Sequence, residues 1–179
     1  KDYVEQNVNY NIFLAQSQVL LEIEQLRERD FERGFELLSR SNQLNFSGTK
    51  YSFPSFVESA KLGHWVFGKV SDKYGDYGKT ILARLDSDSN TVLISDLTIS
   101  CRIAKRNIEA AFFCYLLDAF SIQNLKCHFK QTDRNLMLQQ VLKDLGVQFE
   151  SRPSELQILE ISNSPALREH AKVVAVTQK

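Results

Sequence analysis

The sequence lacks any apolar run that approaches the roughly 18 to 20 residues of a membrane-spanning helix. Its first residues do not follow the pattern of a secretory signal peptide. Its 22 basic and 22 acidic residues cancel, so no broad electrostatic field would attract nucleic acid or an anionic membrane. We therefore expect neither kind of partner, and any anion site must be local.

Cysteine is also scarce. Cys101, Cys114 and Cys127 stand far apart and form no Cys-x-x-Cys pair. This spacing argues against a disulfide framework and against a zinc site, so we expect no bound metal. Reduced thiols are typical of the cytoplasm, where we expect this protein to be. The sequence begins with Lys1 rather than Met, so we expect a piece of a longer protein, with trimming of the first residues as the alternative.

The chain of 179 residues, 43% of them hydrophobic, is long enough to bury a sizeable core. We predict a domain over residues 18–162. Residues 1–17 mix amide, acidic and aromatic side chains, which indicates a linker or the remnant of an upstream domain. A plain N-terminal helix of the same domain is the alternative. Residues 163–179 are predicted to be a weakly helical tail.

Hydrophobic periodicity predicts the secondary structure between these limits. Strands are expected at 18–26, 64–72, 79–88, 91–103 and 126–130, with 147–151 pairing with 156–161. Helices are expected after Asp30, over 107–120 and over 133–145, with Thr132 as the cap of the last. Residues 73–78 read as a tight turn. This order predicts an α/β (α+β) fold with a mixed, mostly antiparallel sheet flanked by helices.

The stretch SDLTISCRIAKRN, residues 95–107, begins as a strand and ends at the start of a helix. The first N–H groups of a helix lack internal partners, and the helix dipole favours an anion there. Arg102, Lys105 and Arg106 add positive charge, and Asn107 is placed to cap the helix. The pattern indicates a phosphate site, with a solvated basic turn as the alternative.

Strict alternation would place Leu93, Leu97, Ile99 and Cys101 on one face of this strand. Cys101 is then either a small buried residue or a nucleophile activated by the nearby cations and the helix N-terminus. On the other face, Asp96 is a candidate general base, or else an ion-pair partner of Arg102 or of a basic side chain elsewhere.

Two other groups of polar residues are open to two interpretations. Asp76, in the sequence Gly-Asp-Tyr-Gly, is either a general base or a turn-forming residue. Asn42, Gln43 and Asn45 either line a groove for an acceptor or make hydrogen bonds within their own loop.

The element order, together with the strand that ends at Arg102, resembles the GCN5-related N-acyltransferase (GNAT) fold. In that superfamily the strand-to-helix loop reads Arg/Gln-x-x-Gly-x-Gly/Ala, and here Lys105 and Asn107 stand at the glycine positions. The resemblance implies binding of the pyrophosphate of acyl-coenzyme A by Ile99, Cys101, Arg102, Ile103, Ala104, Lys105, Arg106 and Asn107. It also implies contact of Asn135 with the pantetheine arm. Val141 and Leu142 occupy the family's position for a tyrosine acid.

Four stretches together resemble the C-terminal region of FkbH-like proteins. These are RSNQLNFSGTKYS (40–52), SDKYGDYG (71–78), LTISCRIAKRNIEAAF (97–112) and QTDRNLMLQQVLKDLG (131–146). The resemblance implies an upstream HAD-type phosphatase-like domain and a place in polyketide or polysaccharide biosynthesis. It also implies an acyl group on a phosphopantetheine thioester, carried by coenzyme A or by an acyl carrier protein. We expect acyl transfer, and the alternative is a non-catalytic module that docks a carrier protein for the HAD-like domain.

Overall fold

The computed structural model describes residues 10, 12–88 and 91–179. Its seven-stranded sheet has the order β6-β5-β4-β3-β2-β1-β7. The strands are β1 (Val19–Gln25), β2 (His64–Asp72), β3 (Gly75–Ser87), β4 (Val92–Ile99), β5 (Asn124–Lys130), β6 (Leu156–Ser162) and β7 (Val174–Gln178). The helices are α2 (Phe31–Arg40), α3 (Phe53–Leu62), α4 (Ile108–Ala119), α5 (Leu136–Asp144) and α6 (Pro165–Ala171). Residues 12–17 form a further short helix before β1.

The sheet is mixed and mostly antiparallel. Strands β1 to β4 form an antiparallel meander, and β6 is antiparallel to β5. Two contacts are parallel, between β4 and β5 and between β1 and β7. The predicted fold class is therefore confirmed.

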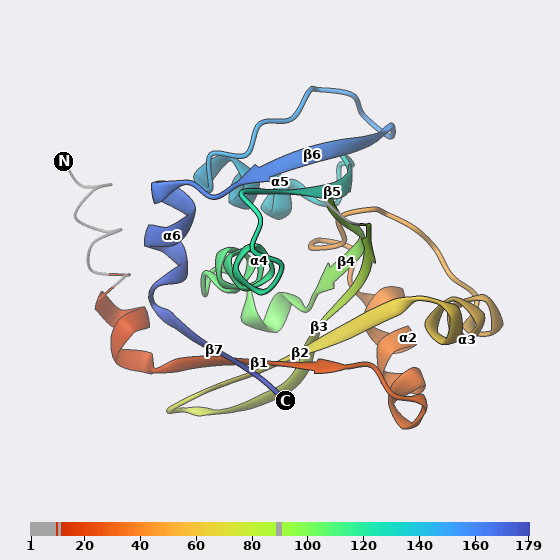
Figure 1. The fold of residues 1–179 in the computed structure, drawn as a ribbon, viewed down its shortest axis with the longest axis horizontal. Coiled ribbons are helices and arrows are strands. Elements are labelled where there is room, and N and C mark those ends of the chain that lie inside the picture. The colour runs from red at the N-terminus through yellow and green to blue at the C-terminus, as the bar shows by residue number, and fades with distance from the viewer. Residues whose placement is uncertain (1–9, 11, 89–90) are drawn as a thin grey trace.

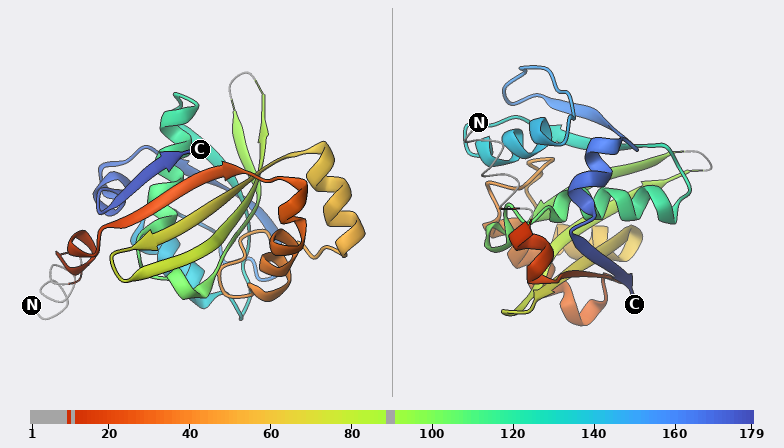
Figure 2. Two further views of the ribbon diagram at one scale, coloured as in Figure 1. Left: turned by 90° about the horizontal axis from the view of Figure 1, so that it is seen from below. Right: turned by 90° about the vertical axis from the view of Figure 1, so that its left-hand side faces the viewer.

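The sheet curls around α4, which Figure 1 shows end-on inside the curve. Nine of the twelve residues of α4 are buried, as expected for a helix that is apolar almost all the way round. Helix α6 lies beside α4, whereas α2 and α3 lie on the outer side of the sheet (Figures 1 and 2). Separate hydrophobic clusters fill the two sides, one around Phe112 and Phe113 and one around Phe56, Trp65 and Phe67.

The two ends of the chain take part in this architecture. Residues 163–179, expected to be a tail, supply α6 and β7, and Val174 at the start of β7 is buried. The sheet therefore extends beyond the boundary predicted at residue 162. Of residues 1–17, expected to be a linker or remnant, residues 1–9 and 11 lie outside the described residues. Leu14, in the helix over 12–17, is 1% exposed.

The predicted strand over 91–103 is too long, and its alternation is wrong. Arg84 pairs with Asp96 and Leu85 with Ile94, so Ser95 has no partner on β3 and forms a bulge. The bulge moves Leu93 off the face that Leu97 and Ile99 present to α4. The strand ends at Ile99, where a 3₁₀ turn over Cys101–Ile103 begins.

Three other local predictions are also wrong. Strand β3 begins at Gly75, so the tight turn is shorter than residues 73–78. Helix α5 begins after Asn135 rather than after Thr132. Strand β6 pairs with β5 and not with residues 147–151.

Candidate functional site

The loop between β4 and α4 has an unusual backbone. Lys105 and Asn107 have φ values of +65° and +58°, in the left-handed region that glycine adopts most easily. These are the two positions at which the GNAT loop carries glycine. The loop therefore has, at both positions, the backbone conformation that glycine favours, although neither residue is glycine.

Buried side chains hold this loop in place. Ile99, Ile103 and Ile108 are each 0% exposed, and the N–H groups of Ile99 and Ile103 donate to the Leu44 and Ser100 carbonyls. The Ala104 N–H donates to the Cys101 carbonyl, and the Tyr10 hydroxyl donates to the Lys105 carbonyl. Asn107 occupies the N-cap position as predicted, but its side chain does not cap the helix.

The three cations of the loop differ in their surroundings. Arg102 and Lys105 are exposed, whereas Arg106 forms an ion pair with Asp72 and lies 4.5 Å from the centre of the Tyr77 ring. Burial raises the pKa of Asp72, but hydrogen bonds from the Tyr74 N–H, Tyr77 and Arg106 lower it below its ordinary value. Arg106 thus anchors the loop to the β2–β3 hairpin. Neither Arg102 nor Lys105 forms an ion pair among the described residues, although the charge of Arg102 helps to lower the pKa of Glu36 on α2.

A cleft of about 750 Å³ lies beside the loop, between the start of α4 and α5. Its lining includes Lys105, Asn107, Glu109, Met137 and Val141. Glu109 is only 2% exposed, and its Oε1 atom has no partner among the described residues. Burial raises its pKa to about 7 against the weaker opposing effect of its own backbone N–H. The carboxyl group is therefore partly neutral at neutral pH.

The crevice between the carboxyl ends of β4 and β5 is filled by the chain itself. The two strands pair only through Leu93 with Lys126 and Ile94 with Cys127. Beyond these pairs they diverge, and residues 44–46, here called the inserted segment, lie between them. Figure 1 shows the chain from the region of α2 passing close to the ends of both strands.

Backbone hydrogen bonds fix the inserted segment on both sides. The Phe46 N–H donates to the Leu97 carbonyl at 2.9 Å, and the Ile99 N–H donates to the Leu44 carbonyl at 3.0 Å. On the other side, the Lys130 N–H donates to the Phe46 carbonyl at 2.7 Å. Ligands of α/β sheets commonly bind in a crevice at the carboxyl ends of parallel strands. Here a strand-like piece of the chain occupies that position.

Asp96 is bonded to the loop that follows the inserted segment. It is 4% exposed and accepts hydrogen bonds from the Ser47 hydroxyl and the Tyr51 hydroxyl, each at 2.7 Å. Burial, together with the hydrogen bond to Asp96, raises the pKa of Tyr51 to about 12. The alternative pairing of Asp96 with Arg102 is wrong, because the strand ends before Arg102.

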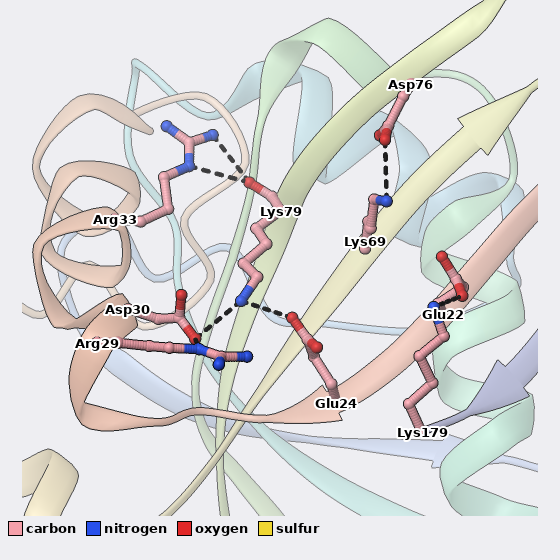
Figure 3. A network of polar contacts seen from close by, with 9 residues as sticks. All are labelled: Glu22, Glu24, Arg29, Asp30, Arg33, Lys69, Asp76, Lys79 and Lys179. Carbon is pink, nitrogen blue, oxygen red and sulfur yellow. Dashed lines mark hydrogen bonds and ion pairs between the residues drawn. The ribbon is translucent and has the colours of Figure 1, made fainter.

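Asp76 is not brought to this loop. It is exposed, and its carboxylate is 2.9 Å from the Lys69 ammonium group, which lowers its pKa together with the Gly78 N–H. Figure 3 shows this pair beside the network in which Lys79 bonds Glu24 and Asp30. Arg106, which joins the loop to this hairpin, pairs with Asp72 instead.

The remaining predicted residues divide between the loop and the turn before α5. Cys101 is exposed beside Arg102, so its interpretation as a buried residue is wrong. Asn135 is 1% exposed, and its side chain is used within the chain. Its Oδ1 accepts from the Thr132 N–H and from Gln139, and its Nδ2 donates to the Lys130 carbonyl.

Two residues at this site were not identified from the sequence. Asp72 is the last residue of an ordinary strand pattern, and Glu109 is a single acid within an apolar helix. Glu109 could have been noticed, because it is an acidic residue in the first turn of a helix that is otherwise almost entirely apolar.

Among residues 10, 12–88 and 91–179, no three histidine, cysteine or acidic side chains form a group suited to a metal ion. None of these residues belongs to a helix long and apolar enough to cross a membrane.

No protein-family model matches the sequence, and no curated protein matches it. Solved structures do match the fold. A GNAT-family acetyltransferase of Streptococcus agalactiae has a TM-score of 0.57 at 11% identity, over 80% of this chain and 96% of that one. The ribosomal-protein-S18-alanine N-acetyltransferase of Escherichia coli has a TM-score of 0.54 at 11% identity, with the same coverage. A Bacillus subtilis acetyltransferase in complex with CoA has a TM-score of 0.53 at 11% identity, over 80% and 99%. The chain has the GNAT acetyltransferase fold.

The loop before α4 and the cleft fit the phosphate of a phosphopantetheine carrier, whereas the crevice between β4 and β5 does not fit its arm. The left-handed loop, the exposed Arg102 and Lys105 and the adjacent cleft suit a phosphate. The crevice between β4 and β5 holds the inserted segment, so an arm could enter it only if that segment moved.

Proposed function

We propose that this chain is an acyltransferase-like domain that handles an acyl group on a phosphopantetheine thioester. The observation that carries the proposal is the backbone of Lys105 and Asn107, which is left-handed at both glycine positions of the loop. The loop and the start of α4 would hold the phosphate of the carrier, with Arg102 and Lys105 as its cations. The carrier would be coenzyme A or an acyl carrier protein.

Acyl transfer from a thioester at this site would need few catalytic side chains. The acceptor attacks the thioester carbonyl and gives its proton to a base, and the carrier sulfur leaves with the bonding electrons and takes up a proton. Cys101 is the exposed nucleophile at the loop, and Asp96 is the buried carboxylate next to the crevice. The position of Asp76, paired with Lys69, makes it the weakest of the three catalytic candidates.

The direct test is a titration calorimetry experiment with coenzyme A and, separately, with a phosphopantetheinylated carrier protein. We expect Arg102→Ala and Lys105→Ala to weaken binding by about tenfold each, as for a lost charge-assisted hydrogen bond. Arg29→Ala is the matched control, because Arg29 is an exposed arginine that does not line the cleft. Binding that the control weakens as much as Arg102→Ala would contradict the proposed phosphate site.

A non-catalytic module that docks a carrier protein is the second candidate, and the inserted segment favours it. A domain whose crevice is closed by its own backbone has no room for the arm, yet still presents the loop and the cleft. The two candidates differ in turnover. Acyl release from a thioester that is abolished in Asp96→Asn supports an enzyme, whereas carrier binding without any acyl release supports docking.

The context of the domain is proposed from the FkbH-like motifs. An upstream HAD-like domain would pass its product to the carrier, in polyketide or polysaccharide biosynthesis. The cytoplasm is the proposed location, since Cys101, Cys114 and Cys127 are all free thiols. Co-purification of the chain with an acyl carrier protein from the natural host would support this context, and its absence would favour coenzyme A.

A further inference from the structure

A second pocket, of about 410 Å³, lies at the carboxyl end of β5, away from the loop before α4. The chain around the inserted segment forms one wall through Asn45, Gly48 and Lys50. The turn between β5 and α5 forms the other through Lys130 and Arg134. Gly48 has a φ of +68°, and a side chain there would come within 3.2 Å of the Lys130 stem, so the glycine lets the two walls approach.

The charge of this pocket is strongly unbalanced. Lys50, Lys130 and Arg134 contribute three positive charges, and Asp133 contributes one negative charge, which leaves a formal charge of +2. Within the part of the chain that the structure describes, none of these three cations forms an ion pair. Three unpaired cations around one hollow favour a multiply charged anion.

A buried donor supplies an independent indication of a ligand. Asn45 is 5% exposed, and its Oδ1 accepts a hydrogen bond from the Gly48 N–H at 2.9 Å. Its Nδ2 is buried and has no partner among the described residues. A buried N–H₂ group without an acceptor is costly, and a ligand oxygen would satisfy it.

Helix α5 adds its own N-terminus to the same pocket. Residues 133–135, which lead into this nine-residue helix, line the pocket, and the Asn135 side chain does not cap the helix. The amides of its first turn therefore have no side-chain acceptor in the N-cap, and the helix dipole favours an anion.

We infer that this pocket binds a small molecule through a phosphate monoester, whose double negative charge matches the unpaired cations. Asn45 also belongs to the inserted segment, so the bound phosphate would lie where the crevice ends. This inference does not depend on the proposed binding of a phosphopantetheine carrier by the loop before α4, because the two pockets share no lining residue.

The test is a titration of the ¹⁵N-labelled chain with inorganic phosphate and with methyl phosphate, followed by amide chemical shifts. We expect changes at the Asn45 side-chain amide, Gly48 and the first residues of α5. Acetate, which has one charge, should bind more weakly. Shifts confined to residues 101–110 would overturn the inference and instead support the proposed phosphate loop. Absence of any shift would also overturn it and would leave the coenzyme A titration to decide the first site.

Substitutions test which residues of the second pocket bind methyl phosphate. Lys50→Gln and Arg134→Gln remove exposed cations and should each weaken methyl phosphate binding by about tenfold. Lys126→Gln is the matched control, because Lys126 is an exposed lysine near the other end of β5. Asn45→Asp keeps the acceptor for the Gly48 N–H, replaces the donor by a carboxylate and should abolish binding. Equal affinities of Arg134→Gln, Lys126→Gln and the unaltered chain would overturn the inference.

Discussion

At the scale of single residues, the conformation of the loop before α4 has an energetic cost. Lys105 carries a side chain at a φ of +65°, which an L residue adopts only with strain. We expect Lys105→Gly to raise the free energy of unfolding by about 1 kcal/mol in urea titrations. Asn107→Gly should raise the free energy of unfolding by less, because asparagine tolerates the left-handed backbone region better than lysine does.

The control for this prediction is Lys105→Ala, which removes the charge and keeps a Cβ atom in the strained conformation. It should give little or no stabilisation. A gain in Lys105→Ala equal to that in Lys105→Gly would mean that the charge, and not the backbone, is the unfavourable feature.

Glu109 predicts a dependence of stability on pH. Its pKa is raised from an ordinary 4.5 to about 7, so the folded protein binds a proton that the unfolded chain has released. This contribution is fully present below pH 4.5 and is lost as pH rises through 7. We expect Glu109→Gln to remove a decline of about 3 kcal/mol in unfolding free energy over this range.

Denaturant titrations at a series of pH values measure that decline. Glu160→Gln, at an exposed glutamate of β6, is the control and should keep the slope of the unaltered chain. A Glu109→Gln variant with the same slope would show that the proton is bound elsewhere.

The sequence predicted that a loop with three cations leads into a helix near residue 107, because the cations are followed at once by a helix pattern. Neither the left-handed angles nor the role of Arg106 could be predicted. The role of Arg106 depends on Asp72 and Tyr77, which lie on a hairpin distant in sequence. Asp96 was found from its place on the polar face, but its partners Ser47 and Tyr51 belong to a loop without periodicity.

At the scale of elements, the inserted segment should behave as a strand. Phe46 is 0% exposed and packs edge-on against Phe113 at 6.0 Å. We expect Phe46→Ala to cost about 3 to 5 kcal/mol of unfolding free energy. Phe53→Ala, at a residue that is 40% exposed, should cost far less.

Hydrogen exchange distinguishes local from global effects in that variant. The amides of Ile99 and Lys130 bond to the inserted segment and should exchange faster in Phe46→Ala than the global loss of stability requires. The exchange rate of the Leu82 amide, in the centre of the β2–β3 ladder, should rise only as much as the global loss of stability requires. Uniform acceleration at all three amides would contradict a segment that opens by itself.

Periodicity found the long strands and α4 because each buries a regular face of its own. It could not find the bulge at Ser95, which is set by register against β3, nor the inserted segment, which is set by two strands at once. Hydrogen bonds between residues distant in sequence leave no periodic signal.

At the scale of the whole molecule, the last strand completes the sheet. Val174 is buried, whereas its neighbour Ala175 on β7 is exposed. We expect Val174→Asp to cost about 3 kcal/mol of unfolding free energy, because it buries a charge without a partner. Ala175→Asp is the matched control and should be close to neutral. Equal costs would contradict the orientation of β7 against β1.

The C-terminal boundary was the least predictable part of the fold. Strand β7 has five residues and pairs with β1, the most distant strand in the chain. So short a segment gives too few residues for a period to emerge, and its strand conformation depends on a partner that only the folded sheet provides.

The inserted segment also bears on the order in which the chain folds. Its partners on β4 and β5 are separated from it in sequence, so both loops must close before these hydrogen bonds form. Strands β5 and β6 join the rest of the sheet directly through only two residue pairs. The inserted segment therefore joins β5 and β6 to the rest of the sheet, and we expect its hydrogen bonds to form late in folding. Substitutions within it should quicken unfolding and leave the rate of folding almost unchanged.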